Sequence, residues 1–134
     1  MKKLTEIEGI GPSYSGKLQD VGVTSIEDLL EKGSAPKGRK ELAEKTGIGE
    51  SQILRWVNMS DLFRIKGVGE EYADLLEAAG VDTVPELGQR NPENLFKKMA
   101  EVNSAKNLVR RVPTETEVKT WVEQAKSLDR KLTY

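Results

Sequence analysis

The chain has 134 residues, 37% of them hydrophobic and 32% charged, and its 21 basic and 22 acidic side chains leave a net charge of −1. This composition predicts a globular protein of one or two small units, and the balanced charge excludes a strong overall field that would attract a polyanion. Cysteine and histidine are both absent, which excludes a disulfide framework, a thiolate metal site and most hydrolytic mechanisms.

Membrane insertion and secretion are not expected. No apolar run approaches the roughly 18 residues that a membrane span needs, and the polar residues after Lys3 differ from a secretory signal. We therefore expect a cytoplasmic protein that has no membrane contact, binds no metal or cofactor and takes no small-molecule substrate.

The first predicted helix begins at Pro12, directly after the turn formed by residues 9–11, and ends at Gly22. Proline is favoured at the first position of a helix because its missing N–H would have no partner there. Glycine is favoured just after a helix because it adopts the left-handed conformation without strain. We therefore expect a tight glycine turn followed by a short, well-bounded helix.

A second short helix is predicted after Ser25, which would cap it in a pair with Asp28, and it should end near Gly33. Residues 34–38 contain serine, proline and glycine and are interpreted as a loop. A further helix ends at a second glycine turn, residues 47–49, and the apolar residues that follow are again spaced for a helix.

The second half of the chain repeats this order. A helix is predicted after the glycine turn 67–69 and ends at Gly80, and a capping box of Thr83 and Glu86 begins the next one. Another helix is predicted over residues 91–102. We interpret residues 101–112 as an insertion, followed by a last helix that begins at Thr114, has Glu117 as its box partner and runs through Leu128. We expect no strand.

The strongest regularity is a repeat at an offset of 58 residues, which predicts a duplicated unit. We expect a first unit over residues 1–59 and a second over 60–134, docked as one compact body. Ten residues of the first half, Ile7, Gly9, Ile10, Gly11, Tyr14, Leu18, Gly22, Val23, Ile26 and Leu29, correspond to Ile65, Gly67, Val68, Gly69, Tyr72, Leu76, Gly80, Val81, Val84 and Leu87.

Three segments carry a resemblance to a known family: the first hairpin (residues 7–12, IEGIGP), the second hairpin (46–49, TGIG) and the third hairpin (65–69, IKGVG). They resemble the turns of helix-hairpin-helix domains, which occur in polymerases, repair proteins and Holliday-junction proteins. The whole chain resembles a bacterial and archaeal family of unknown function built from two such units. The resemblance implies an all-α, SAM-like helix-hairpin-helix bundle of eight to ten short helices.

The resemblance also implies a function, because hairpins of the DNA-binding members hold a backbone phosphate with main-chain N–H groups, independently of base sequence. We therefore expect a non-catalytic module that binds DNA weakly and in a salt-sensitive manner. The candidate nucleic-acid-binding residues are Gly9, Ile10, Gly11, Ser13, Lys17, Lys37, Arg39, Lys40, Lys45, Gly67, Gly69, Arg110 and Arg111.

A protein-interaction or scaffolding module without nucleic-acid binding is the alternative. Glu50, Glu70 and Glu71 follow the second and third hairpins and would repel a phosphate. A tight turn between helices also needs its glycines whether or not anything binds. The two tryptophans, Trp56 and Trp121, are expected in the core because both lie on apolar helix faces.

Overall fold

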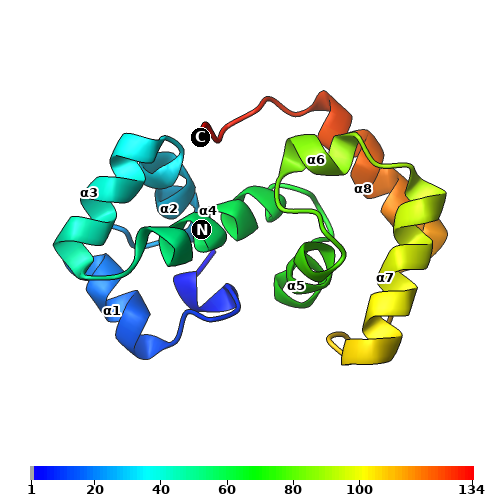
Figure 1. The fold of residues 1–134 in the computed structure, drawn as a ribbon, viewed down its shortest axis with the longest axis horizontal. Coiled ribbons are helices and arrows are strands. Elements are labelled where there is room, and N and C mark those ends of the chain that lie inside the picture. The colour runs from blue at the N-terminus through cyan, green and yellow to red at the C-terminus, as the bar shows by residue number, and fades with distance from the viewer. Residues whose placement is uncertain (1) are drawn as a thin grey trace. The chain divides into compact units, whose positions relative to one another are not determined.

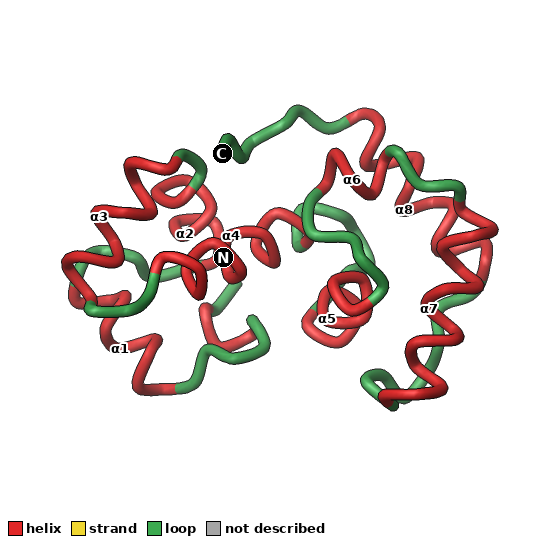
Figure 2. Tube along the Cα trace, viewed as in Figure 1, coloured by secondary structure: helices red, strands yellow, loops and turns green. Residues whose placement is uncertain are grey.

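The computed structural model describes residues 2–134, and within that range it is all-α, with eight α-helices, one 3-10 helix and no strand. The expected all-α class is confirmed (Figures 1 and 2). The elements are η1 (Leu4–Glu6), α1 (Pro12–Asp20), α2 (Ile26–Gly33), α3 (Pro36–Thr46), α4 (Glu50–Leu62), α5 (Glu70–Ala78), α6 (Val84–Gly88), α7 (Pro92–Lys106) and α8 (Glu115–Ser127).

The chain divides into two compact units. Unit 1 consists of Met1–Asp61 together with Lys131–Tyr134, and unit 2 consists of Leu62–Arg130. The division falls two residues after the expected boundary at residue 59. The last four residues differ more from the expectation, because they belong to unit 1 although they follow unit 2 in the chain.

In unit 1, α3 packs against both α1 and α2. Ile53, Trp56 and Val57 of α4 are fully buried, as expected for Trp56. The terminal segment is held to this unit by a backbone hydrogen bond from the Thr133 N–H to the Ser34 carbonyl at 2.7 Å, and its Leu132 side chain is only 2% exposed.

In unit 2, α8 packs against α6 and α7, and α7 also contacts α5. Trp121 and Val122 of α8 are buried, which confirms the expected core position of Trp121. Gly88 at the end of α6 allows a close approach to α8, since a Cβ there would lie 3.3 Å from the main-chain nitrogen of Lys126. The core of this unit is therefore centred on α8.

The interpretation of residues 34–38 as a loop is wrong, because α3 begins at Pro36. Proline and glycine are frequent in loops, but proline here occupies the first helical position. Gly38 has a packing reason to be in the helix, since a Cβ at this position would overlap the Lys32 carbonyl oxygen. Pro36 therefore starts α3, and Gly38 allows α3 to pack closely on α2.

The predicted helix caps had mixed outcomes. Thr114 and Glu117 form the expected capping box. The predicted box of Thr83 and Glu86 is wrong: Thr83 makes no side-chain cap, and Glu86 accepts a hydrogen bond from the Asp82 N–H at 3.3 Å instead.

Ser25 caps α2 as expected, with the Asp28 N–H donating to its hydroxyl at 3.1 Å. The Asp28 carboxylate itself accepts from Thr24 and not from the N–H of Ser25, so the pair is not a reciprocal box. The segment interpreted as an insertion is half helical, because α7 runs on to Lys106 before a loop over residues 107–113.

Candidate nucleic-acid interface

The first hairpin is a tight turn that leaves its glycines at the surface. The Ile10 N–H donates to the Ile7 carbonyl at 3.1 Å, and both side chains are buried beneath the turn. Gly9 adopts φ +96°, a conformation that favours glycine. The main-chain N–H of Ile10 is therefore used inside the turn, and Ile10 contributes an anchor and not a phosphate contact.

The free donors of the first hairpin lie at the start of α1. Gly11 is the N-cap residue and has no side chain to cap the helix, and the first turn contains no acidic residue. Within the described residues, the main-chain N–H groups of Gly11, Ser13 and Tyr14 have no hydrogen-bond acceptor. Exposed amides at a helix N-terminus carry partial positive charge and attract anions.

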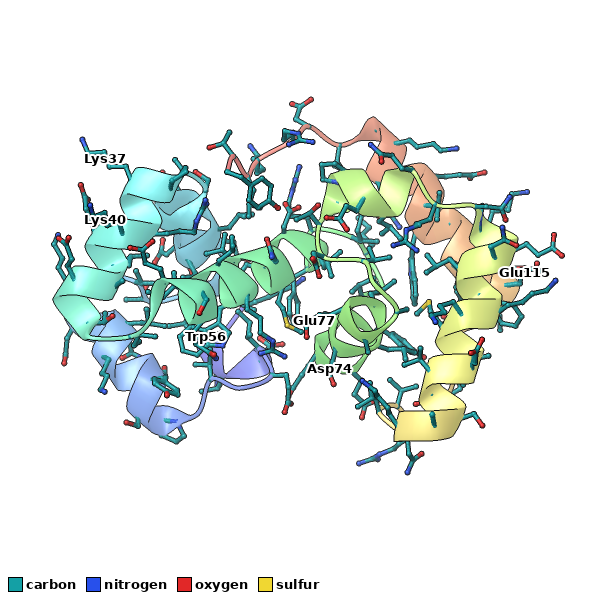
Figure 3. All side chains as sticks on the ribbon, viewed as in Figure 1. Lys37, Lys40, Trp56, Asp74, Glu77 and Glu115 are labelled. Atoms are coloured by element: carbon teal, nitrogen blue, oxygen red, sulfur yellow. The ribbon has the colours of Figure 1, made fainter. Side chains whose placement is uncertain are left out.

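Gly9 lies against side chains of α4. A Cβ on this glycine would lie 3.3 Å from Arg55 Nη1, 3.4 Å from Trp56 Nε1 and 3.8 Å from Gln52 Nε2. The Trp56 Nε1 is buried and has no hydrogen-bond acceptor among the described residues. Arg55 Nη1 also donates to the Glu8 carbonyl at 3.1 Å, which fixes its head group beside the turn. Three nitrogen donors thus converge on the first hairpin (Figure 3 labels Trp56).

The basic residues of unit 1 fall into two groups. Lys17 lies on α1, exposed, with its Nζ 5.8 Å from the centroid of the Tyr14 ring. Lys37, Lys40 and Lys45 lie along α3 and are also exposed; the first two project away from the helix in Figure 3. These four lysines are available to an anion.

Arg39 differs from the other candidates on α3 because its side chain is 6% exposed. Its Nη1 donates to the Gly33 carbonyl at 2.8 Å and its Nη2 to the Thr133 carbonyl at 2.7 Å. Burial lowers the pKa of this guanidinium from its usual value, with Tyr134 and Glu50 opposing the shift. Arg39 therefore holds the terminal segment in place and does not present its charge to a ligand.

The third hairpin has the same backbone as the first. Gly67 adopts φ +94°, and the Val68 N–H donates to the Ile65 carbonyl at 3.2 Å. Gly69 is an N-cap residue without a side-chain cap, but Glu70 and Glu71 occupy the first turn of α5. Two acidic residues therefore begin the helix at which a phosphate would bind, which disfavours binding.

The basic residues near the third hairpin are only partly available. Arg111 makes a two-pronged ion pair with Glu117, at 2.9 and 3.1 Å. This pair lowers the pKa of Glu117 to about 2, first through the hydrogen bond from Arg111 and then through the Thr114 N–H. The Arg111 carbonyl accepts a hydrogen bond from the Tyr72 hydroxyl at 3.0 Å. Arg110 is exposed, whereas Arg111 is already paired.

The second hairpin serves as a helix connection. Gly47 ends α3 with φ +76°, and the Ile48 N–H donates to the Thr46 hydroxyl at 3.2 Å. Glu50 then occupies the first turn of α4. This turn carries a carboxylate at its helix start, as the third hairpin does.

Sequence reasoning missed Gln52 and Arg55 as candidates. They lie three residues apart, on neighbouring positions of one helix face. Nothing in the local pattern indicates that this face meets a turn more than forty residues earlier, so only the tertiary structure reveals them. Trp56 was assigned to the core, which is correct for its ring but leaves its N–H without an acceptor.

Neither a membrane span nor a metal centre is found within residues 2–134. None of the helices there combines the length and the apolar character needed to cross a bilayer. Acidic side chains in the same range do not gather in threes at a spacing suited to a metal ion.

Comparison with known proteins gives one match. The family model described as "Domain of unknown function (DUF4332)" matches residues 8–128. No curated protein and no solved structure matches the chain. The match extends from the first hairpin to the end of α8 and includes every α-helix. The chain therefore belongs to the DUF4332 family of unknown function.

Proposed function

We propose that the chain is a non-catalytic DNA-binding module of the cytoplasm, built from two helix-hairpin-helix units, that contacts backbone phosphate independently of base sequence. One observation carries the proposal: the first hairpin ends in exposed main-chain N–H groups at a helix start that has no acidic residue. Such a group of donors suits the oxygen atoms of a phosphate.

The side chains around the first hairpin support the same ligand. Arg55 and Lys17 contribute positive charge close to the turn. Lys37, Lys40 and Lys45 are exposed on α3, where the exposed Glu41 and Glu44 are interleaved with them. Contacts of this kind give affinity without reading the bases. Their number is small and the net charge of the chain is −1, so the affinity should be modest and fall steeply with salt.

Parallel contacts in the two units support the proposal of a duplicated helix-hairpin-helix unit. The Tyr14 and Trp56 ring centroids are 5.1 Å apart, and those of Tyr72 and Trp121 are 5.2 Å apart. A second parallel concerns the glycine that follows α1 or α5. In unit 1, Lys32 donates to the Gly22 carbonyl at 2.7 Å. In unit 2, Arg90 donates to the Gly80 carbonyl at 2.8 Å. Arg90 and Gly80 each lie 58 residues after their counterparts in unit 1, Lys32 and Gly22.

The test is a titration of labelled single-stranded and double-stranded DNA at several salt concentrations. We expect binding at about 50 mM salt, with the logarithm of the association constant falling by about 0.9 per phosphate neutralised on duplex DNA for each tenfold rise in salt. Lys37→Glu with Lys40→Glu should weaken binding by tenfold or more. A matched control carries Lys119→Glu with Lys126→Glu, two exposed lysines of α8.

A protein-interaction module is the second candidate, and the carboxylates after the second and third hairpins favour it. If the wild-type chain binds neither form of DNA at low salt, this alternative replaces the proposal. If the Lys37 and Lys40 changes weaken binding no more than the α8 changes, DNA binding stands but the lysines of α3 do not belong to its site.

A further inference from the structure

The side chain of Tyr14 is unusually accessible for an aromatic residue of this protein. It is 39% exposed, and among residues 2–134 the only other large hydrophobic side chain that is exposed is Tyr134. Tyr14 lies in the first turn of α1, two residues after Pro12. An exposed aromatic ring therefore adjoins the free N–H groups of the first hairpin.

The Tyr14 ring is supported from the protein interior. The fully buried Trp56 contacts it edge to face, with ring centroids 5.1 Å apart and ring planes at 62°. Lys17 places its Nζ 5.8 Å from the ring centroid on the same helix. A ring that is already held in place loses little conformational freedom when a ligand packs on it, which favours binding.

The same place has a hydrogen-bond donor without an acceptor. Trp56 is 0% exposed, and its Nε1 has no acceptor among the described residues although it lies against Gly9. Arg55 and Gln52 direct nitrogen atoms to the same glycine. Buried donors nearly always have an acceptor in native proteins, so this cluster points to an oxygen-bearing ligand or a bridging water.

We propose that the first hairpin selects single-stranded over double-stranded DNA, with Tyr14 stacking on a base while the adjoining phosphate lies against the hairpin N–H groups and Arg55. The proposal rests on the proposed function and adds the form of the DNA and the residue that selects it. In a duplex the faces of the bases are covered by their neighbours, whereas an unpaired base offers its face to an aromatic ring. Phosphate contacts alone would not distinguish the two forms in this way.

The third hairpin keeps the contact between tyrosine and tryptophan but lacks the exposed ring, the arginine beside the glycine and a helix start without acidic residues. The Tyr72 hydroxyl is bonded to the Arg111 carbonyl, the ring is less exposed, and Glu70 and Glu71 begin the helix. The three atoms nearest to a Cβ on Gly67 all belong to Trp121, and no arginine or glutamine nitrogen is among them. We therefore expect one stacking position in the chain, in unit 1.

The experiment compares a labelled single strand of about twelve thymidines with a duplex of the same length. Wild type should bind the single strand at least about fivefold more tightly. Tyr14→Leu should raise the single-strand dissociation constant by about fivefold or more and leave the duplex constant within twofold. Tyr14→Phe keeps the ring and should retain the preference, and Tyr72→Leu is the matched control at the corresponding position of unit 2.

A second readout guards against a folding defect of Tyr14→Leu. A strand containing 2-aminopurine reports stacking through loss of its fluorescence, and the loss should occur with wild type and Tyr14→Phe at saturation. Equal affinity for both forms of DNA in the wild type, or equal weakening of both by a folded Tyr14→Leu, would overturn the inference while DNA binding stands. If the wild type binds neither form, the proposed function fails first.

Discussion

The first and third hairpins share a backbone and differ in the residues around it. Gly9 and Gly67 have φ angles within two degrees of each other, and a tryptophan packs on each. The first hairpin leads into Pro12 and Ser13, and the third leads into two glutamates at the corresponding positions. The comparison shows that the glycine turn is a requirement of the fold, whereas its suitability for an anion depends on the helix start that follows.

The largest effect is expected from giving the first hairpin the chemistry of the third. Ser13→Glu places a carboxylate where Glu71 lies in unit 2, and a like charge at about 4 Å opposes a phosphate by up to about 4 kcal/mol before screening. We expect DNA affinity to fall by roughly 10- to 100-fold, measured by fluorescence anisotropy at low salt. Thermal stability should hold or rise slightly, because an acidic residue favours a helix N-terminus.

Ser13→Gln is the matched control, because it has the size of glutamate without its charge, and it should bind nearly as wild type does. The reverse change, Glu70→Ser with Glu71→Ser, removes the repulsion at the third hairpin and should strengthen binding a fewfold. Unchanged affinity of Ser13→Glu would separate DNA binding from the first hairpin.

A second prediction concerns the positive-φ glycine that the first and third hairpins share. Gly67→Ala and Gly9→Ala place a Cβ in a left-handed conformation, which costs about 1–2 kcal/mol of stability. The loss should be greater at Gly67, where the Cβ would lie 3.0 Å from Trp121 Nε1, than at Gly9, where its nearest neighbour is at 3.3 Å. Urea unfolding measures both values.

Gly11→Ala is the control for these glycine variants. It has no atom within 4 Å of a Cβ and no positive φ, so its stability should change by less than about 0.5 kcal/mol. A cost as large as that of Gly9→Ala would show that backbone conformation is not what requires glycine in this turn.

A smaller effect is expected from Arg55→Gln, which keeps a donor beside Gly9 but removes its charge. Affinity for DNA should fall by about three- to fivefold, and the salt dependence should decrease by about the contribution of one phosphate. Lys126→Gln removes one charge from α8 and serves as the control. If both variants weaken binding equally, only net charge matters and Arg55 has no place in the site.

The smallest effect is expected in unit 2, where Arg111, near the third hairpin, is paired with Glu117. The pKa of Glu117 is lowered to about 2 in the folded chain from an ordinary value of 4.5. A group whose pKa is lowered on folding adds stability above its unfolded pKa, so this contribution is complete above about 4.5 and is lost as the pH falls towards 2. The pair is largely exposed, which limits the contribution to less than about 1 kcal/mol.

The contribution of Glu117 to the free energy of unfolding is measured by unfolding wild type and Glu117→Gln at about pH 6 and about pH 2.5. The variant should be less stable than wild type at the higher pH, and the difference should narrow at the lower one. Glu115→Gln, on the first turn of the same helix, is the comparison. A difference that stays constant with pH would mean that the carboxylate charge does not contribute.

Much of the fold could be predicted from the sequence because its signals are local. Glycines at turns, the capping box of Thr114 and Glu117, and apolar residues at helical spacing each act within a few residues. The error at Pro36 arose because proline and glycine favour loops and helix starts alike, and the choice between them depends on packing against α2.

The candidate site was less predictable because its parts come from distant segments. The first hairpin could be located from Gly9 and Gly11, but the approach of Arg55 depends on how α4 packs. Arg39 shows the opposite case: its neighbours in sequence are exposed lysines, and only the tertiary structure reveals that its charge is turned inward onto two carbonyl groups. Charge clusters along a sequence therefore do not establish a basic surface.

The assignment of residues 131–134 to unit 1 has a consequence for biosynthesis. A ribosome releases the N-terminal segments first, yet the terminal segment that bonds to Ser34 and Arg39 is translated only after all of unit 2. The contacts of this segment with Ser34 and Arg39 can form only after unit 2 has been translated, so unit 2 can reach its final structure before unit 1 does. The unit that is translated first can thus be the last to be completed.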